Sequence, residues 1–175
     1  MSTATLVSIE QYLATHYKPD CDYVDGEILD RNVGEREHSF IQKRLTVALD
    51  KIETRLGIST WPEVRVQVSP TRFRVPDLCL YRGPGPRDSI FHQPPFLCIE
   101  ILSPEDRMSR MAAKLDDYFA FGVECVWVID PVRRAASVHT PAGSHPIRDG
   151  FLRTANPEIA IALNDLFPES LTEPG

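Results

Sequence analysis

Two apolar segments of this sequence each carry a single carboxylate. Asp77 lies in the run 74–81, and Glu100 lies in the run 96–102. An acid inside an apolar strand is costly unless something pairs with it, and two such acids on neighbouring strands can share a divalent cation. Mg²⁺ binds about six oxygen ligands and keeps several waters, so the two carboxylates and the backbone carbonyl of Ile101 form a sufficient set. The pair therefore predicts a metal-dependent hydrolase, with phosphodiester cleavage as the favoured reaction; the alternative is that each acid caps a strand or pairs with an arginine.

A lysine follows the two acids, on a predicted helix that ends near Phe121. Lys114 lies at the edge of an apolar stripe, from which its ammonium could reach over the sheet toward the acids. There it could position an attacking water or stabilise charge on a phosphate; the alternative is a lysine whose stem packs on the stripe while its head stays in water. Arg107 and Arg110 continue a basic line from Lys114 and are candidate contacts to nucleic acid. The apolar stripe consists of Met108, Met111, Leu115, Tyr118 and Phe119.

Two further polar residues open the first long predicted helix. Glu37 precedes Ile41 by four residues and His38 precedes Leu45 by seven, so both are expected to point roughly inward. Either could join the metal shell or act as a base. A role in capping the helix or at the edge of the core is the alternative for each.

Composition and motifs exclude several classes of protein. The chain has 175 residues and a formal net charge of −6, which counts against a protein that coats nucleic acid non-specifically but does not exclude a nuclease. No phosphate-binding loop, GxSxG or HExxH motif is present, so neither an NTPase nor a zincin fits. The length favours one domain over residues 1–175, with a core of about 20–167 and a loose tail at 168–175.

The cysteine pattern and the N-terminus predict a compartment. Four cysteines show no CxxC and no zinc spacing, and three of them lie in apolar runs, where a free thiol behaves as a small hydrophobe. We find no signal peptide at Met1–Glu10 and no run of the roughly 20 apolar residues that a membrane helix needs. These features indicate a cytoplasmic protein without a membrane partner.

The pattern of apolar residues and turn signals predicts helices and strands in mixed order. The segment 96–130 is expected to be a strand–helix–strand crossover with parallel strands, so the fold class is α/β with a mixed sheet flanked by helices. We expect a helix at Ser8–Tyr17, a hairpin at Tyr23–Leu29, a helix at Glu35–Leu56, strands at Glu63–Val68 and around Asp77 joined through Ser69-Pro70-Thr71, a loop at Gly83–Pro95, a strand at Phe96–Leu102, a helix from Ser103-Pro104 to Phe121, strands at Glu124–Asp130, Ala136–His139 and near Phe151, and a short turn at Leu163–Phe167.

In these residues the chain resembles the PD-(D/E)xK nuclease superfamily, and within it the Uma-type group of bacterial restriction-endonuclease-like proteins. The similarity spans roughly residues 20–167, and the ordered set of motifs is more specific than any one of them. The matching segments are Asp22-Tyr23-Val24-Asp25-Gly26-Glu27, His38, Pro76-Asp77, Glu100-Ile101-Leu102-Ser103-Pro104, Lys114 with Tyr118, and Gly122-Val123 through Trp127 to Asp130-Pro131.

The resemblance implies a restriction-endonuclease-like fold and Mg²⁺- or Mn²⁺-dependent hydrolysis of DNA. By that analogy Asp77 and Glu100 are metal ligands and Lys114 is the catalytic lysine. The superfamily motif places its lysine two residues after the acid, where this chain has Leu102, and Asp22 stands where the group more often has Glu. The alternative is therefore a catalytically inactive relative that binds nucleic acid or a protein partner. A homodimer would suit cleavage of both strands.

Overall fold

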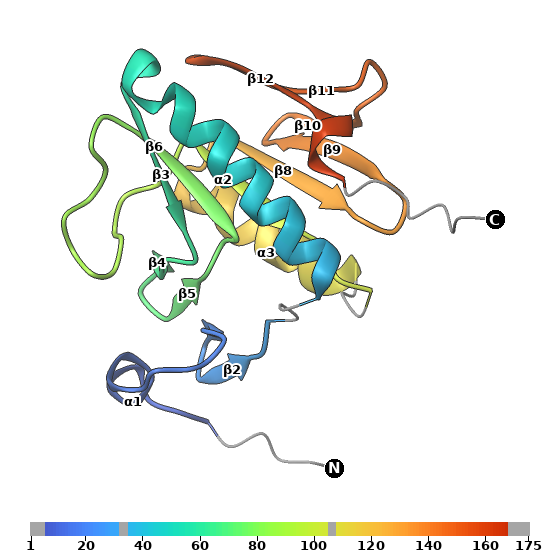
Figure 1. Cartoon of the computed structure of the whole chain (residues 1–175). Helices are drawn as coiled ribbons and strands as arrows, with labels where there is room; N and C mark the ends of the chain where they lie inside the picture. The colour runs from blue at the N-terminus through green and yellow to red at the C-terminus, as the bar shows by residue number, and fades with distance from the viewer. Residues whose placement is uncertain (1–5, 32–34, 105–107, 168–175) are drawn as a thin grey trace.

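The centre of the computed structural model is a six-stranded mixed sheet (Figure 1). The structure describes residues 6–31, 35–104 and 108–167. Strands β7 and β8 are parallel, and every other neighbouring pair in this sheet is antiparallel. In the order β10-β9-β8-β7-β6-β3, the sheet contains β10 (Gly143–Pro146), β9 (Ala135–Thr140), β8 (Cys125–Asp130), β7 (Leu97–Ile101), β6 (Leu78–Arg82) and β3 (Ile58–Pro62).

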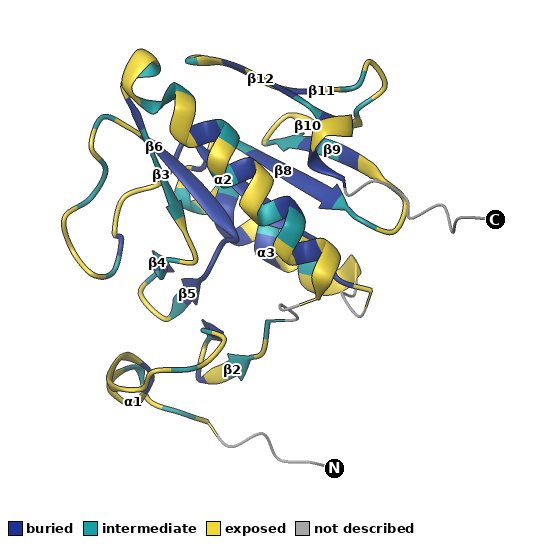
Figure 2. Ribbon diagram, viewed as in Figure 1, coloured by how far each residue is buried: buried dark blue, intermediate teal, exposed yellow. Residues whose placement is uncertain are grey.

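Two helices cover the two faces of this sheet, which confirms the predicted fold class. Helix α2 (Arg36–Leu56) packs on the face that carries Leu78 and Leu80, and α3 (Met108–Phe121) packs on the face that carries Cys79 and Tyr81. Because side chains alternate along a strand, one apolar run supplies both layers of core. Figure 2 shows β6 and β8 as almost entirely buried, whereas α2 buries only the side that faces the sheet.

The long helix α2 ends as its sequence predicts. Gly57 adopts the left-handed conformation with φ of 63°, and its N–H bonds to the carbonyl of Glu53. Glycine adopts this conformation without steric cost, so the chain turns directly into β3. The predicted crossover is also confirmed, since α3 connects the parallel strands β7 and β8. None of the described helices is long and apolar enough to cross a membrane.

A second, smaller sheet lies below the central one in Figure 1. It contains β2 (Glu27–Leu29), β1 (Asp22–Val24), β5 (Arg72–Arg74) and β4 (Val66–Ser69), in that order. Helix α1 (Ile9–Ala14) packs on it through Tyr12 and is capped by Ser8 and Gln11, which bond to each other's backbone N–H. The predicted Ser8 cap and the hairpin of β1 and β2 are confirmed, but α1 ends at Ala14 rather than Tyr17.

The apolar run 74–81 does not form one strand, which corrects the prediction. Its first residue ends β5 in the small sheet, and residues 78–81 belong to β6 in the central sheet. The turn at Pro70-Thr71 therefore joins β4 to β5, not to the strand after Asp77. Pro76 lacks an N–H for a strand ladder, and the chain crosses between the sheets at this point. Asp77 thus lies at the junction of the two sheets.

Several C-terminal and edge elements were missed or shifted in the sequence-based prediction. Strands β3 and β10 lie at the two edges of the central sheet, where few residues are buried and the apolar alternation is weak. The predicted strands near Ala136 and Phe151 correspond to β9 and β11 (Phe151–Ala155), and the latter pairs with the unpredicted β12 (Glu158–Ala162). The predicted turn is the short helix η1 (Leu163–Leu166). Helix α3 is described from Met108; the first turn expected after Pro104 and the tail at 168–175 lie outside the described residues.

Candidate active site

The segment Val75-Pro76-Asp77 is held where the two sheets meet. The backbone N–H of Val75 donates to Asp22 Oδ1 at 2.7 Å, and Lys114 Nζ donates to the carbonyl of Val75 at 3.2 Å. The backbone N–H of Ile101, at the end of β7, donates to Asp77 Oδ2 at 2.7 Å. Contacts from the small sheet, α3 and β7 therefore converge on the same three residues and position the Asp77 carboxylate.

Glu100 and Lys114 form a buried ion pair beside this segment. Lys114 Nζ lies 2.9 Å from Glu100 Oε2, and the hydroxyl of Tyr118 donates to Glu100 Oε1 at 2.6 Å. Both charged residues are almost inaccessible, with 4% of Glu100 and 7% of Lys114 exposed. The alternative, in which the ammonium of Lys114 stays in water, is therefore wrong. The lysine reaches Glu100, as predicted for an ammonium that extends over the sheet toward the acids.

Four residues of the apolar stripe predicted for α3 pack against the sheet as expected, and Met108 does not. The four are Met111, Leu115, Tyr118 and Phe119. Met108 is 78% exposed, whereas Lys114, Asp117 and Tyr118 are buried. The polar side of α3 faces the junction because the buried charged groups there require oppositely charged partners, whereas the side chain of Met108 can remain in solvent. The expectation that Met108 contributes to the core is wrong.

Arg31, which follows β2, and His38, in the first turn of α2, lie against the carboxylate of Asp77. Arg31 Nη2 lies 2.5 Å from Asp77 Oδ1, and His38 Nε2 lies 3.2 Å from the same oxygen. The side chains of Arg31, His38 and Asp77 are 6%, 3% and 4% exposed. The alternative interpretation, that this acid pairs with an arginine, is therefore confirmed for Asp77. The same carboxylate is one of the two predicted metal ligands.

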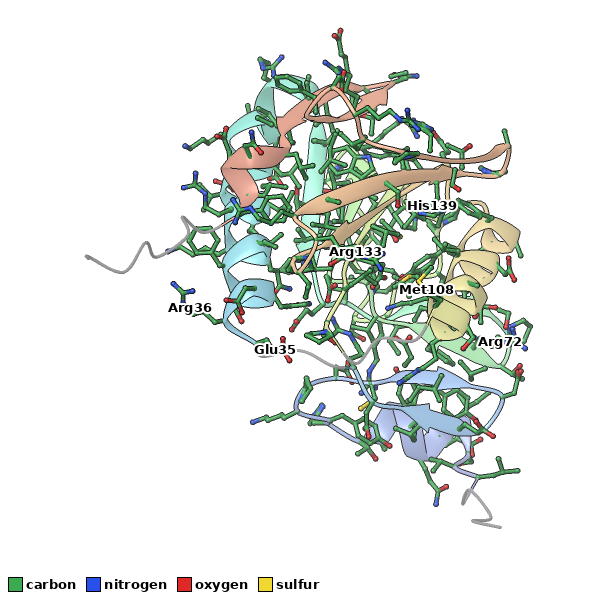
Figure 3. The ribbon with its side chains drawn as sticks, turned by 90° about the vertical axis from the view of Figure 1, so that its right-hand side faces the viewer. Glu35, Arg36, Arg72, Met108, Arg133 and His139 are labelled. Carbon is green, nitrogen blue, oxygen red and sulfur yellow. The ribbon has the colours of Figure 1, made fainter. Side chains whose placement is uncertain are left out.

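A second layer of charge lies between α3 and the small sheet. Arg74 bonds Asp22 Oδ2 at 3.1 Å and Asp117 Oδ2 at 2.6 Å. Asp22 Oδ2 also lies 3.6 Å from Lys114 Nζ, which links this layer to the ion pair with Glu100. Arg72, labelled beside α3 in Figure 3, donates to Asp117 Oδ1 from a more exposed position. Acids and cations therefore alternate through the junction, so that each buried charge has an opposite neighbour.

Burial and neighbouring charge shift the pKa values of these groups in different directions. Burial raises the pKa of Glu100 to about 7, although the ammonium of Lys114 opposes the shift. Burial also disfavours the carboxylate of Asp77, but His38 and Arg31 outweigh it, so this pKa lies below its ordinary value. Lys114 is likewise penalised by burial, yet Asp22 and Glu100 hold its pKa above the ordinary value. At neutral pH the site therefore holds an ionised Asp77, a charged lysine and a glutamate close to its titration midpoint.

The raised pKa of Glu100 predicts that the protein loses stability as the pH rises from 5 to 8. The group titrates near 4.5 when unfolded and near 7 when folded, so its stabilising contribution is complete below pH 4.5 and is lost through pH 7. The loss should amount to about 3 kcal/mol, and the raised pKa of His38 acts in the same direction. Asp77 adds nothing in this window because its pKa is lowered.

Urea unfolding in EDTA at pH 5, 6, 7 and 8 measures this effect. The free energy of unfolding should fall across the series, and Glu100→Gln should remove most of the slope. A wild-type stability that rises with pH would contradict the assignment of a raised pKa to Glu100.

The accessory residues behave differently from one another. His38 is buried beside Asp77, but Glu37 lies at the surface, with 48% of its side chain exposed, next to Arg36. One residue corresponds to about 100° of helical rotation, so only one of the two can face the sheet. Arg110 is exposed and donates to the carbonyl of Asp30 at 2.8 Å. Arg107 lies outside the described residues.

The carbonyl of Ile101 faces the same side as Asp77. The N–H of Leu102 donates to the carbonyl of Ile129 in β8, and because backbone groups alternate sides along a strand, the N–H and carbonyl of the preceding Ile101 face β6. The N–H of Ile101 accordingly reaches Asp77, beyond the last residue of β7 that pairs with β6. Two carboxylates and a carbonyl oxygen are the hard ligands that Mg²⁺ prefers, and the donor set fits this ion. Among the residues that the structure describes, no group of three or more His, Cys, Asp or Glu side chains forms a ready-made metal site.

Sequence reasoning missed Arg31, Arg74 and Asp117, which the structure brings into the junction. Asp22 was assigned only by resemblance, and Arg31 and Arg74 were not singled out at all. Arg74 stands at the start of the apolar run that contains Asp77. A charged residue in such a run requires a buried partner of opposite charge, so its position in the sequence could have marked it as a site residue. No local pattern marks Arg31, which lies 46 residues before Asp77 in the chain.

A mixed sheet covered by helices on both faces, with two buried acids at its central strands and a buried lysine on α3 that contacts one of them, defines the restriction-endonuclease-like class of fold. The chain belongs to the Uma2 family, described as "Putative restriction endonuclease", whose sequence model matches residues 9–169. The fold is similar to a crystal structure described as a putative nuclease belonging to DUF820 from Anabaena variabilis ATCC 29413. That similarity has a TM-score of 0.78 at 20% identity and covers 92% of this chain and 97% of the other. A search of curated proteins found no significant match.

Proposed function

We propose that this protein is a metal-dependent endonuclease that hydrolyses phosphodiester bonds in DNA. The observation that carries the proposal is the buried ammonium of Lys114, 2.9 Å from Glu100, beside the segment that ends in Asp77. A buried ion pair is weak evidence for stability alone, and perturbed charges gathered at one junction favour a functional role. Membership of the Uma2 family supports the nuclease class.

Asp77, Glu100 and the carbonyl of Ile101 are the groups that would hold Mg²⁺ or Mn²⁺. When bound, such an ion supplies charge neutralisation at the scissile phosphate and a nucleophile at neutral pH. His38 and the Ile101 N–H orient the carboxylate of Asp77, and the Tyr118 hydroxyl orients that of Glu100. Lys114 provides a fixed positive charge where negative charge develops on the phosphate.

A second candidate function is that of a catalytically inactive relative that binds nucleic acid or a protein partner. Leu102 occupies the position of the superfamily lysine, and both acids already have cationic partners, which favours this alternative. The two functions differ in whether the protein cleaves DNA, and in whether substitution of Asp77 or Glu100 abolishes that cleavage.

Cleavage of supercoiled plasmid DNA with Mg²⁺, Mn²⁺ or EDTA tests the proposal. Wild-type protein should nick the plasmid only with metal, and Asp77→Asn and Glu100→Gln should each reduce the rate by about 10²-fold or more, because each removes a charged ligand. Asp149→Asn is the matched control, since this acid is 60% exposed on a loop away from the junction. Metal-dependent cleavage retained in both site variants would overturn the assignment, and salt-sensitive binding without turnover would favour the inactive relative.

A further inference from the structure

The position of Arg31 suggests a role in the site that the pairing with Asp77 alone does not explain. We propose that Arg31 is a displaceable cation: its guanidinium neutralises Asp77 until a divalent cation binds there, and then binds the scissile phosphate group of the nucleic acid. The inference rests on the proposed function and adds a phosphate-binding residue to it.

Arg31 contacts the Asp77 oxygen that the backbone leaves available, and His38 Nε2 lies 3.2 Å from the same oxygen. Arg31 Nη2 lies 2.5 Å from Asp77 Oδ1, while the N–H of Ile101 occupies Oδ2. The oxygen that Arg31 covers is thus the one not held by the backbone of β7. A divalent cation that binds this oxygen competes with the guanidinium, because two positive groups at one oxygen repel each other.

The balance of charge at the junction leads to the same conclusion. Asp77 and Glu100 are paired with Arg31 and Lys114, and Asp22 shares Arg74 with Asp117. A divalent cation added beside Asp77 brings excess positive charge into a buried region, where repulsion is strong. A phosphodiester group brings one negative charge, which favours an arrangement in which a cation contacts the phosphate.

Arg31 has a second anionic neighbour and an unused donor that suit this exchange, whereas Lys114 does not. Lys114 is fixed by Glu100 and by the carbonyl of Val75. Arg31 Nη2 also lies 3.7 Å from Glu63, whose side chain is 40% exposed, so the guanidinium has a second anionic neighbour toward solvent. Its Nη1 is buried with no hydrogen-bond partner among the described residues, so one donor of the guanidinium is unused. The planar donor fork of arginine matches two phosphate oxygens.

Binding of Mn²⁺ to the full chain, measured by isothermal titration calorimetry, tests the first half of the inference. Arg31→Gln should bind Mn²⁺ about tenfold or more tightly than wild type, because a competing unit charge is gone. Arg133→Gln is the matched control, since this arginine, labelled in Figure 3, is 82% exposed and forms an ion pair with Asp130 at 3.8 Å, away from Asp77 and Glu100. Its Mn²⁺ affinity should equal that of wild type.

Anisotropy of a fluorescent DNA duplex with Ca²⁺ in place of the catalytic ion tests the second half. Arg31→Gln should weaken duplex binding by about tenfold, as expected for loss of a bidentate phosphate contact. Arg31→Lys keeps the positive charge but lacks the planar pair of N–H donors that can bind two phosphate oxygens. This variant should therefore retain wild-type Mn²⁺ affinity and lose part of the duplex affinity. If Arg31→Gln does not fold, Arg31→Lys by itself tests the phosphate contact through its loss of duplex affinity.

The outcomes separate this inference from the proposed function. If Asp77→Asn abolishes Mn²⁺ binding but Arg31→Gln leaves it unchanged, the metal site stands and the inference is overturned. Tighter Mn²⁺ binding with unchanged duplex affinity would overturn the phosphate contact alone. If neither wild type nor Arg31→Gln binds Mn²⁺, the proposed metal-dependent function fails, and the inference fails with it.

Discussion

Replacement of Lys114 by methionine should reduce DNA cleavage by about 10²–10³-fold or more while the fold persists. The ammonium is the fixed positive charge nearest Glu100, and removal of one such group from a preorganised site typically costs this much in rate. The fold should persist because Glu100 already titrates near pH 7 and can take up a proton when its partner is lost. Its hydrogen bond from Tyr118 remains.

Tyr118→Phe is the matched control for this experiment. It removes a hydroxyl that contacts the same carboxylate without removing charge, so cleavage should fall much less than in Lys114→Met. Plasmid nicking rates and circular dichroism spectra of both variants give the comparison. Equal losses in the two variants would show that orientation of Glu100, rather than the charge of Lys114, governs the rate, and wild-type activity in Lys114→Met would remove the lysine from the site.

Replacement of Arg74 by methionine should lower the free energy of unfolding by about 3–5 kcal/mol. Arg74 is 3% exposed and bonds both Asp22 and Asp117, so the variant leaves two buried carboxylates without their shared cation. Because Asp22 also holds the N–H of Val75, the loss should extend to the segment that positions Asp77. Urea unfolding monitored by tryptophan fluorescence measures the change.

Arg72→Met is the control for the Arg74 variant. Arg72 also bonds Asp117, but its side chain is 38% exposed, so its removal should cost less than about 1 kcal/mol. Asp117→Asn in the Arg74→Met background should recover part of the lost stability, since it removes one of the two unpaired charges. Equal losses in the two arginine variants would contradict the view that Arg74 neutralises a buried network.

The two predictions concern different layers of the same junction. Lys114 and Glu100 lie where the chemistry is proposed, and Arg74 with its acids holds the small sheet against α3. The link between them is Asp22, which contacts both Arg74 and Lys114. Substitutions in the outer layer are therefore expected to lower activity through the position of the crossing segment.

Local patterns were enough to predict the elements with a clear periodicity, and residue types were enough to find the acids that conflict with their surroundings. The periodicity of 35–56 and the glycine after it predicted α2, and the run–helix–run pattern of 96–130 predicted parallel strands. Asp77 and Glu100 were found because a carboxylate in an apolar run needs a partner, and this requirement holds in any fold. The motif order also indicated the family that the comparison shows.

The partners of these residues could not be predicted from local patterns, because they depend on how the sheets and helices pack together. The run 74–81 reads as one strand, but its two ends belong to different sheets, since the choice of neighbouring strand is a long-range property. The prediction for α3 was wrong at Met108 because the burial of Lys114 and Asp117 depends on Asp22 and Arg74 from another sheet. Arg31 carries no local signal, since an arginine is compatible with solvent everywhere and becomes a site residue only when folding brings it against a buried acid.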